Sequence, residues 1–290
     1  MAHEPRITLE LGTDAAAAAM AVVLPGLGAF NATRLPAPAT RYGVLARDMG
    51  TDAVLAGISV VVYGTIGYSH WAGWAVPAAE GGPALPAVVT RAARAAQVRG
   101  CTRLEAHVRA HDDMSPYEAL GFRPTVRVPD HIAGGDYTVM ALELPADLPP
   151  AIPEGVSLEL REPISRLLAG EMWTRLDRRR QSRLPERPRW ACALVRQSET
   201  VMGGALCYGT AGDFMVDMVW LDETLRGRNL GLEMLTRALE AGRDMGCTRA
   251  GVETMDCQAP GFYPKAGFAP IAYVPSDVPG MGMTFFRMRL

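Results

Sequence analysis

The sequence predicts an α+β fold that occurs twice along the chain. The 290 residues are about twice the length of a common domain. The second half contains several short runs of alternating apolar and polar residues, separated by turn residues and by one amphipathic helix. A sequence repeat relates the two halves. These observations favour two domains of one architecture over a single large domain.

The repeat has an offset of 146 residues. Gly100-Cys101-Thr102-Arg103 recurs as Gly246-Cys247-Thr248-Arg249, and sliding residues 100–144 onto 246–290 without a gap gives 13 identities in 45 positions. Self-similarity at a fixed period marks an architecture built from repeated units. We therefore interpret the chain as a tandem duplication.

The joint between the two repeats lies in a proline-rich stretch. Residues 144–153 read Leu-Pro-Ala-Asp-Leu-Pro-Pro-Ala-Ile-Pro, and proline continues neither a helix nor a central strand. We therefore place the boundary near residue 147 and expect a first domain at 1–147 and a second at 148–290.

The second half predicts its elements in order. Three strands separated by short turns indicate an antiparallel meander, and the helix that follows carries one apolar stripe. We expect a strand at Val156–Leu160, a helix at Ile164–Asp177, strands at Trp190–Arg196, Val201–Tyr208 and Phe214–Leu221, a helix at Leu230–Met245, a strand at Arg249–Met255, a short helix at Pro260–Ala266, and strands at Ala269–Val274 and Met283–Arg289.

Composition excludes several functions. The formal net charge of −2 gives no basic surface for nucleic acid. The five cysteines show no metal-ligand spacing, so we expect reduced thiols and no metal. All five histidines lie in the first half, which excludes a Ser/His/Asp triad or a histidine zinc site in the second. The apolar run Ala15–Val23 is too short to span a membrane, so we expect a cytoplasmic protein with no membrane partner.

The informative segment joins the end of a strand to a helix through a glycine-containing turn. Residues 226–231 read Arg-Gly-Arg-Asn-Leu-Gly. The first N–H groups of a helix have no partner within it, and together with the helix dipole they favour an anion such as a pyrophosphate. The glycines permit close backbone approach and the arginines add positive charge. An ordinary strand-to-helix turn with solvated arginines is the alternative that these residues leave open.

Two segments together resemble a known family. The loop at 226–231 resembles the R/Q-x-x-G-x-G/A acyl-CoA loop of the GNAT superfamily, with Asn229 where the first glycine usually stands. Residues 258–268 are similar to that superfamily's A-x-x-F-Y-x-K-x-G-F segment. The resemblance covers nearly all of 155–290 and, in weaker form, about 25–144. It implies two GNAT-like domains, each a mostly antiparallel mixed central sheet flanked by helices, with acetyl-CoA or another acyl-CoA as co-substrate.

The resemblance also implies where the acyl-CoA binds. Its pantetheine arm would pair with the splayed strand before the loop, and its pyrophosphate would lie on the loop and the helix start. The implied residues are Val219, Trp220 and Leu221 for the arm, and Arg226, Gly227, Arg228, Asn229, Leu230 and Gly231 for the pyrophosphate. Tyr263 would lie near the sulfur, where a phenol of pKa about 10 can protonate the leaving thiolate.

The general base is the least specified group. Asp217 is a carboxylate among four apolar neighbours on an expected strand, which is unusual enough to require a reason. It deprotonates the amine, directly or through water, or it caps a hydrogen-bond network, and the sequence leaves both open. Glu253 and Asp256 are the other candidates.

The first half departs from the acyl-CoA pattern. Residues 80–85, which match 226–231, read Glu-Gly-Gly-Pro-Ala-Leu, so a carboxylate replaces the arginine and Pro83 removes an N–H donor. A carboxylate beside a pyrophosphate is repulsive by about 1 kcal/mol or more. We therefore expect a degenerate first domain that binds acyl-CoA poorly or not at all, although Tyr117 matches Tyr263.

These observations converge on an N-acyltransferase. We expect it to move an acetyl or other short acyl group from acyl-CoA to a primary amine of a small molecule, by direct transfer in a ternary complex. The C-terminal domain would be the active one, in a monomer or homodimer. Two alternatives stay open, a non-catalytic acyl-CoA binding or sensing module and an acetyltransferase of protein amines.

Overall fold

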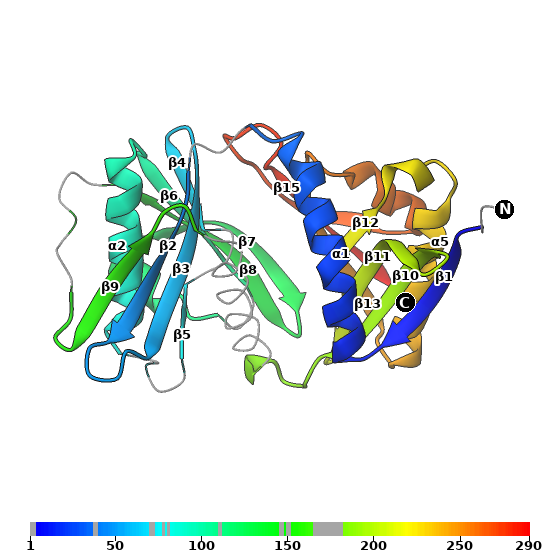
Figure 1. Cartoon of the computed structure of the whole chain (residues 1–290), viewed down its shortest axis with the longest axis horizontal. Coiled ribbons are helices and arrows are strands. Elements are labelled where there is room, and N and C mark those ends of the chain that lie inside the picture. Colours follow the sequence, from blue (N-terminus) through cyan, green and yellow to red (C-terminus); the bar gives the residue numbers. More distant parts are fainter. Residues whose placement is uncertain are drawn as a thin grey trace. The chain divides into compact units, whose positions relative to one another are not determined.

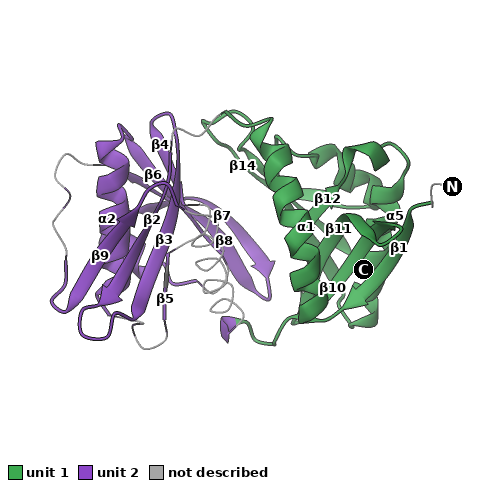
Figure 2. Cartoon of the chain, in the orientation of Figure 1, with its two compact units in different colours: residues 1–36, 184–290 green, residues 37–183 purple. Residues whose placement is uncertain are grey.

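The chain divides into two compact units, shown in different colours in Figure 2. The structure is a computed structural model that describes residues 4–36, 40–69, 73–76, 79, 82–109, 112–144, 148, 152–164 and 182–290. Unit 1 joins residues 1–36 to 184–290, and unit 2 comprises residues 37–183. This division differs from the expected boundary near residue 147, because the first strand of each repeat lies in the unit that holds the later strands of the other repeat.

Unit 1 is built on a seven-stranded sheet with the order β1-β10-β11-β12-β13-β15-β14 (Figure 1). Only β12 and β13 run parallel, and α5 connects them. The strands are β1 (Arg6–Leu11), β10 (Arg189–Gln197), β11 (Thr200–Thr210), β12 (Asp213–Leu221), β13 (Arg249–Met255), β14 (Ala269–Val274) and β15 (Met283–Arg289), and the helices are α1 (Thr13–Ala32), η2 (Glu223–Leu225), α5 (Leu230–Asp244) and η3 (Pro260–Ala266).

Helices α5 and α1 cover opposite faces of this sheet. The apolar stripe of α5, which includes Leu235 and Leu239, packs with Phe214 and the alternate residues of β10 and β11. On the other face Gly204 of β11 lies against Val23 of α1. The alternation along each strand thus fixes which helix each side chain meets.

Unit 2 repeats this topology with the strand order β9-β2-β3-β4-β6-β8-β7. The short strand β5 is not part of this order and pairs with β3. Here β4 and β6 form the parallel pair, joined through α2. The strands are β2 (Thr40–Asp48), β3 (Val54–Tyr63), β4 (Ile66–Ser69), β5 (Trp74–Ala75), β6 (Arg103–Val108), β7 (Arg123–Ile132), β8 (Gly135–Glu143) and β9 (Val156–Arg161), and the helices are α2 (Ala84–Val98) and α3 (Ser115–Ala119). The shared topology supports the interpretation of the repeat as a duplication.

The first strands of the two repeats are exchanged between the sheets. Strand β1, from the N-terminus, pairs antiparallel with β10, and β9, from the start of the second repeat, pairs antiparallel with β2. Equivalent ion pairs accompany the two pairings, Glu10–Arg196 at 2.7 Å and Glu159–Arg47 at 3.2 Å. Each sheet is therefore completed by a strand from the other half of the sequence.

The predicted fold class and nearly all predicted strands of the second half are confirmed. The antiparallel meander β10–β12, the connecting helix α5 and the strands β13 to β15 occur within about one to two residues of the expected bounds. The predicted segment Val156–Leu160 is a strand, but it completes unit 2. The helix expected at Ile164–Asp177 lies almost wholly outside the described residues.

Helix α1 is longer than the apolar run suggested. Within the described part of the chain it is the one helix that could cross a membrane by length and composition, with 17% of its apolar window buried. The apolar segment is thus longer than the run Ala15–Val23 on which the expectation was based. One helix of this kind is weak evidence, and in this structure its inner face packs on the sheet of unit 1 through Ala16, Ala19 and Val23.

Candidate active site

The sheet of unit 1 opens between its two parallel strands. The ladder between β12 and β13 runs from Asp213↔Arg249 to Val216↔Val252 and stops there, although β12 continues to Leu221 and β13 to Met255. Past this point β12 still pairs with β11, and β13 still pairs with β15. Two strand edges thus face each other with backbone groups available to an extended ligand.

Asp217 lies where the opening begins. The register between β11 and β12 shifts here, since Leu206 pairs with Met218 whereas Cys207 pairs with Val216. Asp217 is the extra residue of this bulge, which re-aims a side chain and bends the strand away from its neighbour. The aspartate is partly exposed and lies within electrostatic range of the Cys207 thiol.

The three residues expected to meet the pantetheine arm form the end of β12. Val219, Trp220 and Leu221 are partly exposed and pair with β11 through Ala205, Gly204 and Gly203. The Trp220 indole lies against α1, because a Cβ added at Gly26 would fall 2.3 Å from its ring. The side chain of Trp220 therefore packs on the helix and leaves the backbone of β12 at the opening.

The predicted anion loop follows β12 directly. Asp222 accepts hydrogen bonds from the backbone N–H and the hydroxyl of Thr224, which hold the pKa of Asp222 below its usual value and start η2. Gly227 has φ +76° and Asn229 has φ +60°, so both take the left-handed conformation. Asn229 is the N-cap of α5 without a side-chain cap bond. The loop thus leads directly into α5, whose first residues, Leu230 and Gly231, are partly exposed. The first N–H groups of α5 have no side-chain cap.

The two arginines of the loop are held differently. Arg226 donates from Nε to the carbonyl oxygen of Leu221 at 2.9 Å, and its guanidinium lies 4.8 Å from the centroid of the Phe30 ring. Arg228 is exposed and makes no hydrogen bond or ion pair with the described residues. Arg226 therefore fixes the start of the loop, whereas Arg228 leaves its charge available to a ligand.

Tyr263 lies in η3, beside the opened part of β13. Its ring is buried among Phe262, Phe268 and Phe286. A side-chain hydrogen bond joins it to Thr254, which follows the last residue of β13 that pairs with β12 by two positions. Burial raises the pKa of Tyr263 well above its usual value, and the hydrogen bond with Thr254 opposes this by less. The phenol is therefore protonated at neutral pH, and burial makes it a weaker acid than a free phenol.

The other carboxylate candidates lie at the end of β13. Glu253 is partly exposed, and Asp256 is exposed and accepts a hydrogen bond of 2.8 Å from the Tyr273 hydroxyl. Three polar or aromatic residues near the opening carried no sequence signal: Phe30 and Asn31 of α1, and Gln258. Phe30 and Asn31 reach this place through the packing of a helix that is distant in sequence, whereas Gln258 is held locally by Thr254 and Met255.

Unit 2 differs at the equivalent places. Glu80 and Gly81 lie outside the described residues, and Pro83 is the N-cap of α2. The Tyr117 hydroxyl accepts a hydrogen bond from the backbone N–H of Gly73, and a Cβ at Gly73 would lie 2.8 Å from Leu85. Gly73 therefore lies against the tyrosine and the start of α2.

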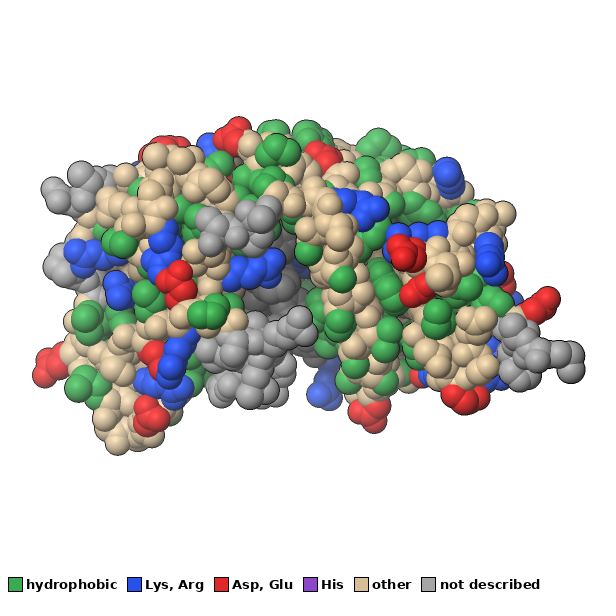
Figure 3. Space-filling view, turned by 45° about the horizontal axis from the view of Figure 1, so that its top comes forward, with side chains coloured by type: hydrophobic (Ala, Val, Ile, Leu, Met, Phe, Trp, Pro, Cys, Tyr) green, Lys and Arg blue, Asp and Glu red, His purple; other side chains and the backbone are tan. Residues whose placement is uncertain are grey.

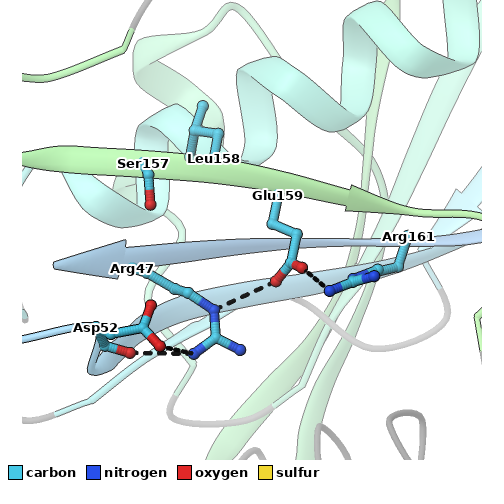
Figure 4. A pocket seen from close by; sticks show the side chains of 6 residues that line it. All are labelled: Arg47, Asp52, Ser157, Leu158, Glu159 and Arg161. Carbon is cyan, nitrogen blue, oxygen red and sulfur yellow. Dashed lines mark hydrogen bonds and ion pairs between the residues drawn. The ribbon is translucent and has the colours of Figure 1, made fainter. Parts of the chain in front are cut away.

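A polar surface pocket of about 440 Å³ lies on unit 2 between β2 and β9 (Figure 4). Arg47 contacts Glu159 at 3.2 Å and Asp52 at 3.7 Å, and Glu159 also pairs with Arg161. These charges compensate one another across the joint between two strands. Figure 3 likewise shows acidic and basic side chains of the described residues interspersed on the face that it draws.

The opened sheet and the uncapped helix start together have the geometry that an extended, anionic ligand requires. Residues 157–268 match the model of the acetyltransferase (GNAT) family. The matched stretch contains both segments that resemble this family, so the resemblance is confirmed for this part of the chain.

Individual relatives match shorter stretches. The blasticidin-S acetyltransferase of Streptomyces morookaense is 42% identical over 67 residues, which cover 23% of this chain and 49% of that protein. Acetyltransferase Atu2258 of Agrobacterium fabrum is 28% identical over 90 residues, which cover 31% of this chain and 66% of that protein. The matches thus span about half to two thirds of the length of these relatives. A solved acetyltransferase of Bacillus cereus is 22% identical, with coverage of 44% of this chain and 94% of that one and a TM-score of 0.35.

Proposed function

We propose that the chain is an acetyl-CoA-dependent N-acetyltransferase whose active site lies in unit 1, and that its acceptor is a primary amine of a small molecule. The observation that carries the proposal is the opening between β12 and β13 directly beside the uncapped start of α5. An extended thioester arm fits between two unpaired strand edges, and a pyrophosphate fits the helix start. The two segments that resemble the GNAT pattern follow β12 and β13 along the chain, which supports this assignment.

Acyl transfer at this opening has three requirements. The amine must lose a proton before it attacks the thioester carbon, the oxyanion that forms must be stabilised, and the leaving thiolate must receive a proton as the C–S bond breaks. Asp217, at the bulge, would accept the amine proton directly or through water. Tyr263, protonated at neutral pH and tied to the opened edge through Thr254, would supply the proton to the thiolate.

The pyrophosphate would lie on the loop from Arg226 to Gly231. The first N–H groups of α5 would donate to it, and Arg228, which has no partner among the described residues, would add a free positive charge. Unit 2 would serve the fold, since its tyrosine is already bonded to Gly73 and Pro83 removes a donor at its helix start.

Calorimetric titration with acetyl-CoA tests the binding step. We expect one site per chain in the wild type, and an affinity about tenfold or more lower in Arg228→Glu, because reversal of a charge near a pyrophosphate removes an attraction and adds a repulsion. Lys265→Glu, in η3, is the matched charge-reversal control. Two sites would overturn the assignment of unit 2 to a structural role, and no site would overturn the proposal.

Turnover with an amine library tests the chemistry, with blasticidin S included because one relative bears its name. We expect Tyr263→Phe to lower kcat by about 10²-fold or more and to leave acetyl-CoA binding unchanged. Binding without turnover of any amine, together with indifference to Tyr263→Phe, would instead support a sensing module.

A further inference from the structure

The last turn of α1 contacts both sides of the opening. On the β12 side the Phe30 ring lies under the guanidinium of Arg226, which in turn donates to the carbonyl oxygen of Leu221 at the end of β12. On the β13 side Asn31 accepts a hydrogen bond of 3.3 Å from Nε2 of Gln258. Two consecutive residues of one helix thus reach the ends of two diverging strands.

The contact on the β13 side continues to the tyrosine. Oε1 of Gln258 accepts from the Thr254 hydroxyl at 3.0 Å and from the backbone N–H of Met255 at 3.1 Å. Thr254 is also the hydrogen-bond partner of Tyr263. The chain of contacts therefore runs from Asn31 through Gln258 and Thr254 to the phenol.

We infer that Phe30 and Asn31 are positioning residues of the C-terminal site, which hold the two strand ends at the separation and orientation that the opening requires. The inference rests on the proposed function for its catalytic meaning. Both residues come from the N-terminal segment, outside the stretch that matches the family model. We call the last turn of α1, with its contacts to Arg226 and Gln258, the brace.

The two residues act on different quantities. Phe30 orients Arg226 and the start of the anion loop, so its loss should weaken acetyl-CoA binding and raise its KM. Asn31 acts through Gln258 and Thr254 on Tyr263, so its loss should lower kcat with little change in KM. A residue with only a general structural role would lower the amount of folded protein without this split.

Matched variants isolate each contact in the full-length chain. Phe30→Leu keeps an apolar side chain and removes the ring, and Phe30→Tyr restores the ring. Asn31→Ala removes the acceptor, and Asn31→Asp restores an acceptor of the same shape. Leu24→Ala, an exposed position on the same helix, is the common control.

We expect Phe30→Leu to weaken acetyl-CoA binding by about twofold to fivefold, as befits an exposed cation–π contact, and Phe30→Tyr and Leu24→Ala to bind like the wild type. Asn31→Ala should lower kcat by a similar factor, and Asn31→Asp should restore it. Equal effects of Phe30→Leu and Leu24→Ala, or failure of both restoring variants, would overturn the brace.

Hydrogen exchange without any ligand separates the brace from the proposed function. We expect faster exchange at residues 222–231 in Phe30→Leu and at 253–258 in Asn31→Ala, each reversed in its restoring variant. A wild type that does not bind acetyl-CoA but shows this exchange pattern would refute the proposed function and support the brace. Unchanged exchange in both variants would refute the brace whether or not acetyl-CoA binds.

Discussion

Replacement of Gly26 by alanine tests whether the N-terminal helix packs on the sheet of unit 1. A Cβ at this position would lie 2.3, 2.5 and 2.7 Å from three atoms of the Trp220 indole. These atoms belong to the body of a rigid ring, so the ring or the helix must shift. Overpacking of this kind costs about 1–3 kcal/mol, whereas glycine to alanine in a helix interior gains at most about 1 kcal/mol. We expect a net loss of up to about 2 kcal/mol.

Gly28 provides the matched control on the same helix. Nothing lies within 4 Å of a Cβ added there, so Gly28→Ala should stabilise by about 0.5–1 kcal/mol through helix propensity alone. Urea unfolding followed by tryptophan fluorescence measures both variants. If Gly26→Ala stabilised the chain as much as Gly28→Ala, α1 would not lie against Trp220, and the exchange of the first elements between the units would be refuted.

Three further changes test other parts of unit 1. Arg249 holds the buried Asp213 with a bidentate contact that includes Nη2–Oδ2 at 2.9 Å, so Arg249→Met should cost about 3–5 kcal/mol in urea unfolding, and the double variant with Asp213→Leu should recover part of it. At the left-handed N-cap, Asn229→Gly should retain stability and acetyl-CoA affinity, whereas Asn229→Ala should cost about 1 kcal/mol in the same assay. Burial raises the pKa of Tyr263 above its value in the unfolded chain. The contribution of the protonated phenol to stability is therefore present below pH about 10 and is lost as the pH rises further. We expect the melting temperature to fall less steeply above pH 10 in Tyr263→Phe than in the wild type.

The sequence predicted local structure better than long-range pairing. The strands β10 to β12 follow from alternation and from turn residues, which act over a few positions. The exchange of β1 and β9 could not be predicted in this way, because the two segments carry almost the same pattern. Thr8-Leu9-Glu10-Leu11 and Ser157-Leu158-Glu159-Leu160 both specify an alternating edge strand with one glutamate. No local feature of either segment determines which sheet that segment joins.

The residues of the candidate site show the same difference between local and long-range features. The loop from Arg226 to Gly231 is contiguous and its chemistry can be read from backbone rules, and Tyr263 belongs to a compact motif. Asp217 was notable as a carboxylate among apolar residues, but its place at a bulge is a property of the register with β11. Phe30 and Asn31 lie at the end of an alanine-rich run with no polar pattern, so only the packing of α1 brings them to the site.

The exchange itself has a test in the two equivalent ion pairs. Glu10 pairs with Arg196 and Glu159 with Arg47, and in each pair both side chains are roughly one quarter to one third exposed. If the first strands returned to their own repeats, the nearly identical patterns would instead place Glu10 beside Arg47 and Glu159 beside Arg196. Double-mutant cycles with alanine distinguish the two arrangements, because coupling requires contact. We expect coupling of about 0.2–1 kcal/mol for the two observed pairs and none for the crossed pairs; coupling in the crossed pairs alone would show that each repeat completes its own sheet, and would remove α1 from the site together with the brace.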